Sequence, residues 1–298
     1  MTFTKLSDTL CQLKAQGIAD LVLCGGEPLL RDDLLAIVCK ASELKFDKIQ
    51  IVTNGFLLTR ERIEQLVESG ITSVYISLNA SESVHDITRG IKGAYAKTMD
   101  ALKSLVELRA SKFPHLDITV QTIIMELTVG QIIDLAKLCL QLRIGLSLSP
   151  LNTSRPWQGA IPADLRSINQ EQLDHVIQEL HCIKKISPSL IRNSHTSLEF
   201  VRGYFADSKR EDIPCYLGYQ KICVGPHGEV YPGCVSLPPV GDLEKASLNR
   251  IISSKAYKES IRNMFLKRCP GCSCDHILNL YSHFPSLVKE MKWRVLPV

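Results

Sequence analysis

The stretch Leu21-Val-Leu-Cys-Gly-Gly-Glu-Pro28 decides the fold of this chain, because it joins a short apolar run to a glycine-rich polar turn. Apolar runs of this length, bounded by turn residues, are typical of buried β-strands. An amphipathic helical pattern precedes the run and ends near Gly17, and a second helical pattern follows Asp33. The sequence therefore predicts a strand at Leu21–Cys24 between two helices.

The same alternation of helix and strand continues to about residue 150. Regular alternation of this kind indicates parallel strands covered by helices, in a sheet or a barrel. The further strands are expected at Lys48–Thr53, Ser73–Leu78, Asp117–Met125 and Gly145–Ser149, with helices at Arg60–Glu68, Tyr95–Arg109 and Val129–Leu142.

The predicted order opens with a helix, whereas a β/α array normally opens with a strand. One strand is therefore expected to be missing upstream of Met1. Its loss would make Leu21–Cys24 an edge strand of the sheet.

Composition excludes several classes of function. With 45% hydrophobic and 22% charged residues and a net charge of +4, the chain has the profile of a soluble globular protein. This balance does not favour nucleic acid or an anionic membrane as a partner. We find no apolar run long enough to span a membrane and no secretory signal at Met1, so we expect a cytoplasmic location.

Polar or glycine-rich residues stand where four of the five predicted strands end. In β/α arrays the chemistry lies at these carboxyl ends. A surface turn explains any one of these motifs alone, and their common placement favours a binding site. The motifs are Gly25-Gly26-Glu27, Thr53-Asn54, Ser77-Leu-Asn79 and Gln121-Thr122, and Arg89 follows the third strand.

The C-terminal part is rich in cysteine. Six of the eleven cysteines fall after residue 214, around a predicted glycine-turn hairpin and in a C-x-x-C motif. Clustered thiols in a reducing compartment bind metal more often than they form disulfides. A four-sulfur cage here could hold zinc or an iron–sulfur cluster. The chain divides into a β/α part at 1–151, a helical connection at 152–214 and a cysteine-rich part at 215–298.

The strand-end motifs, taken in order with the His85-Asp86…Arg89-Gly90 segment, resemble the radical S-adenosylmethionine (radical SAM) superfamily. The cysteine-rich part is similar to the SPASM/Twitch extension of that superfamily. The resemblance implies an α/β fold, a partial (β/α)6 TIM-like barrel lacking its first strand, followed by a small α+β domain. It also implies an auxiliary [4Fe–4S] cluster and S-adenosylmethionine as cofactors.

The resemblance also implies roles for individual residues of the site. Gly25, Gly26 and Glu27 match the motif that holds the methionyl amino group, and Arg89 matches a basic residue that meets the methionyl carboxylate. The remaining matches, which line the same ligand, are Thr53, Asn54 and Ser77.

A single auxiliary cluster is expected, because a [4Fe–4S] cluster with full protein ligation needs four thiolates. Its expected ligands are Cys215, Cys234, Cys269 and Cys272. We expect Cys223 to pack against the sheet. Cys274 could replace Cys272, His276 is more typical of a solvated loop, and four-cysteine zinc remains open on spacing alone.

One departure from the family is large. The superfamily's C-x-x-x-C-x-x-C loop, which holds the cluster that reduces S-adenosylmethionine, is absent from these 298 residues. Cys11, Cys24 and Cys39 do not have that spacing, and we expect them to be buried as small hydrophobic residues. Because the missing loop and the missing first strand fall in the same place, we interpret the sequence as truncated before Met1.

A complete enzyme of this family would form a 5′-deoxyadenosyl radical that abstracts hydrogen from a substrate. A peptide is the expected substrate class, and a reductant protein is the expected partner. The chain by itself is predicted not to cleave S-adenosylmethionine. The rival hypotheses are a non-catalytic iron–sulfur or peptide-binding remnant and a zinc-stabilised structural protein.

Overall fold

The computed structural model describes residues 1–152, 165, 167–206, 215–266 and 268. Its first part alternates helices and strands as the sequence predicts. The strands are β1 (Asp20–Leu23), β2 (Lys48–Thr53), β3 (Ser73–Ser77), β4 (Asp117–Ile124) and β5 (Gly145–Pro150). The helices are α1 (Phe3–Ala15), η1 (Pro28–Leu30), α2 (Leu34–Glu43), α3 (Arg60–Ser69), α4 (Glu82–Arg89), α5 (Ala94–Ser111), α6 (Glu126–Val129), α7 (Ile132–Gln141), α8 (Gln170–Ile186) and α9 (His195–Phe205).

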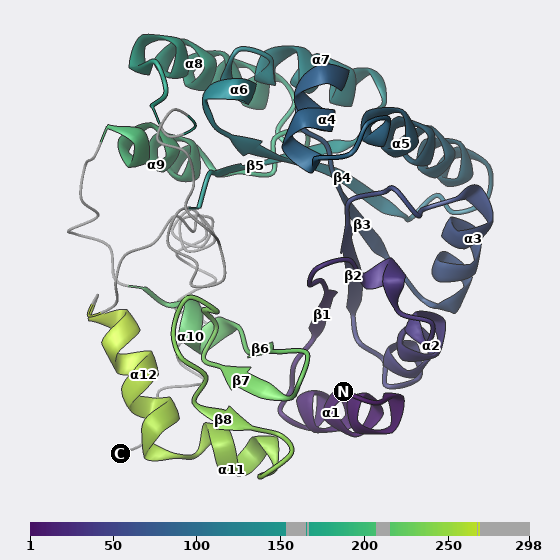
Figure 1. Ribbon diagram of the computed structural model, residues 1–298, viewed down its shortest axis with the longest axis vertical. Helices are drawn as coiled ribbons and strands as arrows, with labels where there is room; N and C mark the ends of the chain where they lie inside the picture. Colours follow the sequence, from purple (N-terminus) through teal and green to yellow (C-terminus); the bar gives the residue numbers. More distant parts are fainter. Residues whose placement is uncertain (153–164, 166, 207–214, 267, 269–298) are drawn as a thin grey trace.

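The five strands form one parallel sheet in the order β1-β2-β3-β4-β5. The sheet curves, and helices cover its outer, convex side (Figure 1). This arrangement confirms the predicted TIM-like half-barrel. Within the described residues β1 is an edge strand, as expected, because it pairs with β2 alone.

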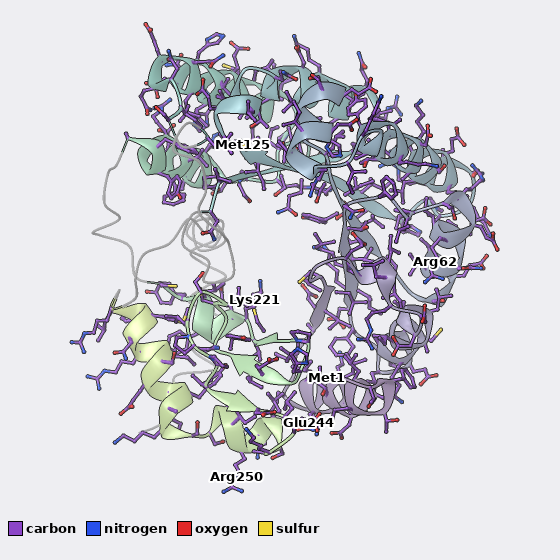
Figure 2. All side chains as sticks on the ribbon, viewed as in Figure 1. Met1, Arg62, Met125, Lys221, Glu244 and Arg250 are labelled. Atoms are coloured by element: carbon purple, nitrogen blue, oxygen red, sulfur yellow. The ribbon has the colours of Figure 1, made fainter. Side chains whose placement is uncertain are left out.

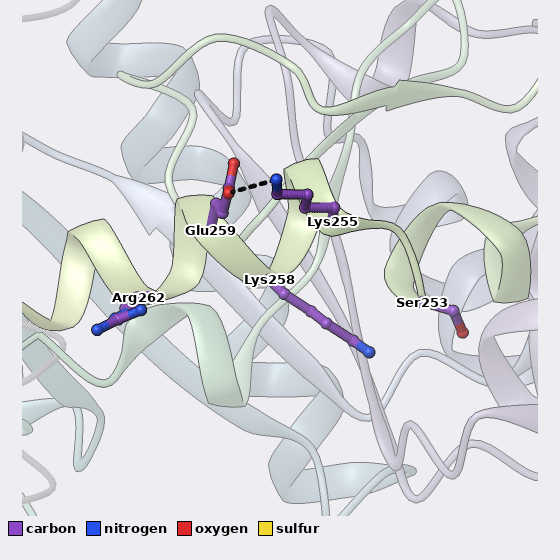
Figure 3. Close-up of a pocket in the computed structure, with 5 residues that line it drawn as sticks. All are labelled: Ser253, Lys255, Lys258, Glu259 and Arg262. Atoms are coloured by element: carbon purple, nitrogen blue, oxygen red, sulfur yellow. Dashed lines mark ion pairs between the residues drawn. The ribbon is translucent and has the colours of Figure 1, made fainter. Parts of the chain in front are cut away.

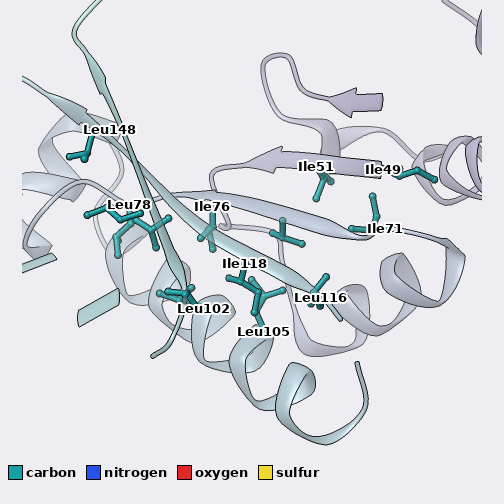
Figure 4. Close-up of a cluster of buried hydrophobic side chains, with 14 of the residues drawn as sticks. Ile49, Ile51, Ile71, Ile76, Leu78, Leu102, Leu105, Leu116, Ile118 and Leu148 are labelled. Carbon is teal, nitrogen blue, oxygen red and sulfur yellow. The ribbon is translucent and has the colours of Figure 1, made fainter. Parts of the chain in front are cut away.

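Alternating side chains give the two faces of the sheet opposite characters. Ile76, Val120 and Leu146 occupy one register row, and each is 0% exposed. All three belong to the main hydrophobic core, and Ile76 lies in the layer between the strands and α5 (Figure 4). Burying one such side chain stabilises the fold by about 1.5–3 kcal/mol, so this layer is the main source of stability.

The inner face carries a different row, in which Ser77, Gln121 and Ser147 lie side by side. All three are only half-buried. Because an apolar outer row alternates with this polar inner row, the concave side of the sheet is the side on which a ligand can be bound.

The second described part is a small antiparallel sheet with three short helices. Its strands are β6 (Cys223–Val224), β7 (Glu229–Tyr231) and β8 (Gly241–Asp242), in the order β6-β7-β8, and its helices are α10 (Leu217–Gln220), α11 (Leu248–Ile252) and α12 (Lys255–Phe265). The part returns to the start of the chain, and α1 packs against α11 (Figure 1). Gln12 Oε1 accepts a hydrogen bond from the Leu248 amide at 2.6 Å.

Two expectations about helices and cysteines are wrong, and one helix was not predicted. The helix expected at Val129–Leu142 is divided at Gly130, and the additional helix α4 follows β3. Cys11, Cys24 and Cys39 are exposed instead of buried. Cys11 and Cys39 lie on the solvent sides of α1 and α2. Cys24 follows the edge strand, on the side where the described residues form no further strand.

No helix in the described part of the chain is both long enough and apolar enough to cross a membrane.

Candidate functional site

Glu27 joins the ends of the first two strands. It follows β1, and its carboxylate accepts hydrogen bonds from the Thr53 hydroxyl at 2.7 Å and from the Asn54 amide at 2.8 Å. It also accepts the Leu29 amide at 3.2 Å, which begins the short helix η1. Three of the residues predicted to share a site, Glu27, Thr53 and Asn54, therefore lie in direct contact.

The backbone before Glu27 is open. Gly25 has φ +148°, a conformation that residues with a side chain rarely adopt, and neither Gly25 nor Gly26 has a neighbouring atom within 4 Å of the position of a Cβ. Both glycines are exposed. The turn therefore presents bare main chain, to which a ligand can come close.

The turn after β2 depends on a glycine for a different reason. Gly55 has φ +80°, and a Cβ there would lie 2.7 Å from Ile76 Cδ1. Its amide donates to the Thr53 hydroxyl at 3.1 Å, while the Asn54 side chain accepts the Phe56 amide at 2.8 Å. These bonds hold Thr53 and Asn54 in the orientation that meets Glu27.

Arg89 brings a positive charge to the same end of the sheet. It lies at the end of α4, after β3, and burial lowers its pKa, while the charge of Glu27 opposes that effect. No ion pair joins Arg89 to Glu27 among the described residues, and Arg89 Nε is buried without a hydrogen-bond partner there. A carboxylate and a guanidinium thus face the same region without neutralising each other by contact.

His85, one helical turn before Arg89, is 1% exposed. Its Nδ1 accepts the Asn79 amide at 3.0 Å, so the ring proton of the neutral form resides on Nε2. Burial, and then the charge of Arg89, lower its pKa to about 4, with Asp86 acting in the opposite direction. His85 is therefore a neutral residue that anchors α4 to the end of β3. In the sequence, its place in the His85-Asp86…Arg89 motif was the signal that could have identified His85 as part of the site.

Asp86 and Tyr95, near His85, have structural tasks. Asp86 accepts the Gly93 amide at 2.5 Å and the Tyr95 amide at 2.8 Å, and these bonds lower the pKa of its carboxyl group. Asp86 therefore fixes the start of α5. The Tyr95 ring meets His85 edge-on, with ring centroids 6.1 Å apart.

Ser77 lies on the inner face in register with Gln121, which in turn pairs with Ser147. Gln121 was noted as a strand end, but Ser147 was not singled out. The alternation of polar and apolar residues along β5 was the signal that could have found it.

Cysteines cluster in the second part of the chain. Cys215 and Cys234 both pack against the small apolar cluster of Leu217 and Met264. Cys223 is half-buried, its thiol donates to the Gly233 carbonyl at 3.6 Å, and burial raises its pKa. The expected ligands Cys269 and Cys272, with the alternatives Cys274 and His276, lie outside the described residues. Among the described residues alone, no group of three or more ligands could hold a metal ion.

Two surface hollows lie away from the strand ends. One, of about 340 Å³, lies over α12, and its basic side chains diverge instead of converging on one point (Figure 3). The other, of about 760 Å³, lies where α1 meets the small sheet, between residues such as Lys5 and Glu244. Met1 and Glu244, which both line this hollow, lie on the same side of the molecule (Figure 2). Neither hollow contains a predicted site residue.

The structure is a parallel β/α half-barrel with polar strand ends, followed by a cysteine-bearing hairpin domain, and in this class of β/α proteins ligands are bound at the carboxyl ends of the strands. Comparison with family models agrees. Residues 3–139 match the radical SAM superfamily, and residues 215–275 match SPASM, an iron–sulfur cluster-binding domain. The chain therefore belongs to the radical SAM superfamily and carries a SPASM domain.

Curated relatives match about half of the chain. The chain is 29% identical over 167 residues to the sporulation killing factor maturation protein SkfB of Bacillus subtilis, covering 54% of this chain and 39% of that protein. It is 31% identical over 134 residues to the PqqA peptide cyclase of Rhodopseudomonas palustris, covering 45% of this chain and 34% of the cyclase. The matches thus span little more than a third of these relatives.

Solved structures support the fold. Streptococcus suis SuiB superposes with a TM-score of 0.66 at 16% identity, over 87% of this chain and 61% of SuiB. SuiB bound to S-adenosylmethionine gives a TM-score of 0.63 at 16% identity, over 87% and 60% of the two chains.

The two families use [4Fe–4S] clusters and S-adenosylmethionine, and the described residues fit the latter. A carboxylate can accept about four hydrogen bonds, and Glu27 accepts three. One position therefore remains for an ammonium group, with the Arg89 guanidinium nearby for a carboxylate. The described thiols of Cys215 and Cys234 are the soft donors that a cluster needs.

Proposed function

We propose that this chain is the core of a radical SAM enzyme that modifies a peptide, with its strand ends holding S-adenosylmethionine and its SPASM domain holding one auxiliary [4Fe–4S] cluster. The observation that carries the proposal is the Glu27 carboxylate, which ties β1 to β2 and acts electrostatically on Arg89. When bound, the cofactor supplies radical chemistry that abstracts hydrogen from a substrate.

The charges of the site complement the methionyl end of the cofactor. Glu27 offers its remaining acceptor position to the ammonium group, and Arg89 offers its guanidinium to the carboxylate. Thr53 and Asn54 position Glu27. Gly25 and Gly26 leave the main chain accessible, and Ser77 lies on the inner face at the end of β3.

The auxiliary cluster is proposed on Cys215, Cys234, Cys269 and Cys272. The support is the common packing of Cys215 and Cys234 against one apolar cluster, together with the SPASM match. Cys223 is assigned a packing role because its thiol is half-buried and bonded to a main-chain carbonyl.

A peptide substrate is supported by the relatives and by the rim of the half-barrel. SkfB is a maturation protein, the PqqA cyclase acts on a peptide, and SuiB has been solved with a precursor peptide. Large apolar residues are exposed in segments that follow successive strands, which suits an extended substrate with apolar side chains. They are Leu30, Phe56, Leu57, Ile87, Ile91 and Leu127. A reductant protein is the proposed partner of the catalytic form.

Cofactor binding tests the site. Isothermal titration of the anaerobically reconstituted chain with S-adenosylmethionine should show binding. E27Q and R89M should each weaken it about 10- to 100-fold, because a hydrogen bond to a charged group contributes about 1.5–3 kcal/mol. The matched control is R62M on the outer helix α3. Wild-type affinity in both E27Q and R89M would refute the assignment.

Metal analysis tests the SPASM domain. Anaerobically purified chain should contain about four iron and four sulfide per polypeptide. C215S and C234S should each lose most of this iron, whereas C182S, an exposed thiol on α8, should retain it. Stoichiometric zinc without sulfide would instead establish the zinc-stabilised alternative.

A second candidate is a non-catalytic iron–sulfur or peptide-binding protein. The absence of the C-x-x-x-C-x-x-C spacing from these 298 residues favours it. The DNA upstream of Met1 separates the two. An in-frame strand followed by that motif supports the enzyme, and a stop codon without it supports the remnant.

A further inference from the structure

One cluster of ionisable side chains lies outside the site described above, between α8 and α9. His181 on α8 lies between His195 and Glu199, which are one turn apart on α9. His181 Nδ1 is 2.6 Å from His195 Nδ1, and His181 Nε2 is 2.6 Å from Glu199 Oε1. Both ring nitrogens of one histidine thus bridge two positions of the facing helix.

The rings meet edge to edge. Their planes differ by 18° and their centroids are 4.8 Å apart, which is close to the N–N distance plus the two ring radii. The two imidazoles are therefore nearly coplanar, and the short contact has the in-line geometry of a shared proton.

The number of protons that this contact can hold is limited. Glu199 is an acceptor, so His181 Nε2 carries a proton, and one proton lies between the two Nδ1 atoms. The arrangement suits two neutral imidazoles or one neutral and one cationic imidazole. Two cations would direct N–H groups at each other across 2.6 Å, so the contact would break.

The surroundings disfavour the doubly charged state. Burial lowers the pKa of His195, and the charges of His181, Lys184 and Lys185 lower it further, against Glu199. Arg202 pairs with Glu199 at 2.9 Å and with Asp174 at 3.0 Å. Among the described elements packed against α8 and α9, β5 has no ionisable side chain, Asp134 and Lys137 of α7 pair with each other, and Glu126 of α6 is exposed.

We propose that His181, His195 and Glu199 form a proton-operated latch, closed while at least one imidazole is neutral and opened when both are protonated. The latch is coupled to the half-barrel because α9 packs against β5. The Tyr204 hydroxyl donates to the Leu151 carbonyl at 2.9 Å, immediately after that strand. Opening the latch loosens α9 and, through Tyr204, the carboxyl end of β5.

Hydrogen exchange of the full chain tests the latch. Between pH 7.5 and pH 5, protection of α9, corrected for intrinsic exchange, should fall by about tenfold, the ratio expected when one charge-assisted hydrogen bond is lost. H195N and H181N should each show a pH-independent α9. H175N removes an exposed histidine from α8 and should retain the wild-type response.

Two results would overturn the proposal. One is a wild-type α9 whose corrected protection does not change with pH. The other is an equal loss of protection at low pH in H195N or H181N, with thermal unfolding first establishing that the variant is folded at pH 7.5.

Discussion

At the scale of single residues, the site depends on how Glu27 divides its hydrogen-bonding capacity. Three donors from the protein fix its carboxylate, and one acceptor position remains. A carboxylate held in this way is ready for a ligand, because its orientation need not change on binding. The same bonds hold β1, the edge strand, to the turn after β2, so a binding residue also stabilises the fold.

Thr53→Val should test how much the hydroxyl of Thr53 stabilises the fold. The variant removes the hydroxyl that donates to Glu27 while keeping a buried side chain of similar shape. We expect a loss of about 1–3 kcal/mol in stability, the cost of leaving a buried partner unsatisfied. Thermal unfolding measures it, and Thr53→Ser, which retains the hydroxyl, is the control. Equal stabilities of the valine and serine variants would contradict the role of this bond.

His85 predicts a pH dependence of stability. Its pKa is lowered from 6.5 to about 4 by burial, so the unfolded chain takes up a proton first as the pH falls. Stability from this residue is complete above pH 6.5 and decreases towards pH 4, by a total of roughly 3 kcal/mol. His85→Phe should flatten the dependence of the melting temperature on pH in this window. His175→Phe should leave it unchanged, and an unaltered slope in H85F would exclude the assignment.

At the scale of elements, the sequence predicted each strand of the parallel sheet to within two residues, because apolar runs bounded by turns report burial directly. Breaks within helices were not predictable in this way. In the region 247–265, for example, Ser254 accepts the Tyr257 amide and begins α12 separately from α11. Such a cap competes locally with helix continuation, and apolar periodicity does not record it.

The glycine turn after β2 offers a test at this scale. Gly55→Ala combines a left-handed backbone with a contact to Ile76, whereas Gly90→Ala meets only the backbone strain, since φ is +67° and no atom lies within 4 Å. We expect about 1–2 kcal/mol of destabilisation in G90A. G55A should lose about 1–3 kcal/mol more from overpacking. Equal melting temperatures would show that Ile76 moves away freely.

At the scale of the whole molecule, the SPASM part and the start of the chain come together across more than two hundred residues. Gln12 bonds to Leu248, and Lys5 lies 4.0 Å from Glu244. Sequence patterns of single elements carry no signal for such a pairing. The cofactor-binding half of the site was accessible from the sequence because strand ends converge by geometry. The latch between α8 and α9 was not, because its three residues meet only after the helices pack.

Whether the chain can cleave S-adenosylmethionine depends on both of its parts. Reductive cleavage of S-adenosylmethionine needs an electron from a cluster that the cofactor can reach. The cysteine spacings of this chain supply no C-x-x-x-C-x-x-C loop. The proposed auxiliary cluster has four thiolate ligands, so it leaves no iron position open to a ligand. The reconstituted and reduced chain should therefore bind S-adenosylmethionine without releasing 5′-deoxyadenosine, as measured by liquid chromatography and mass spectrometry.

A radical SAM enzyme with an intact motif, treated identically, is the positive control for that assay. Formation of 5′-deoxyadenosine by this chain, and its loss in C215S, would mean that the SPASM cluster itself delivers the electron and keeps an open position. The SPASM cluster would then have a reducing role instead of the proposed auxiliary role. A wild-type chain that binds the cofactor but forms no product, with or without Cys215, is the expected result and supports the auxiliary role of the SPASM cluster.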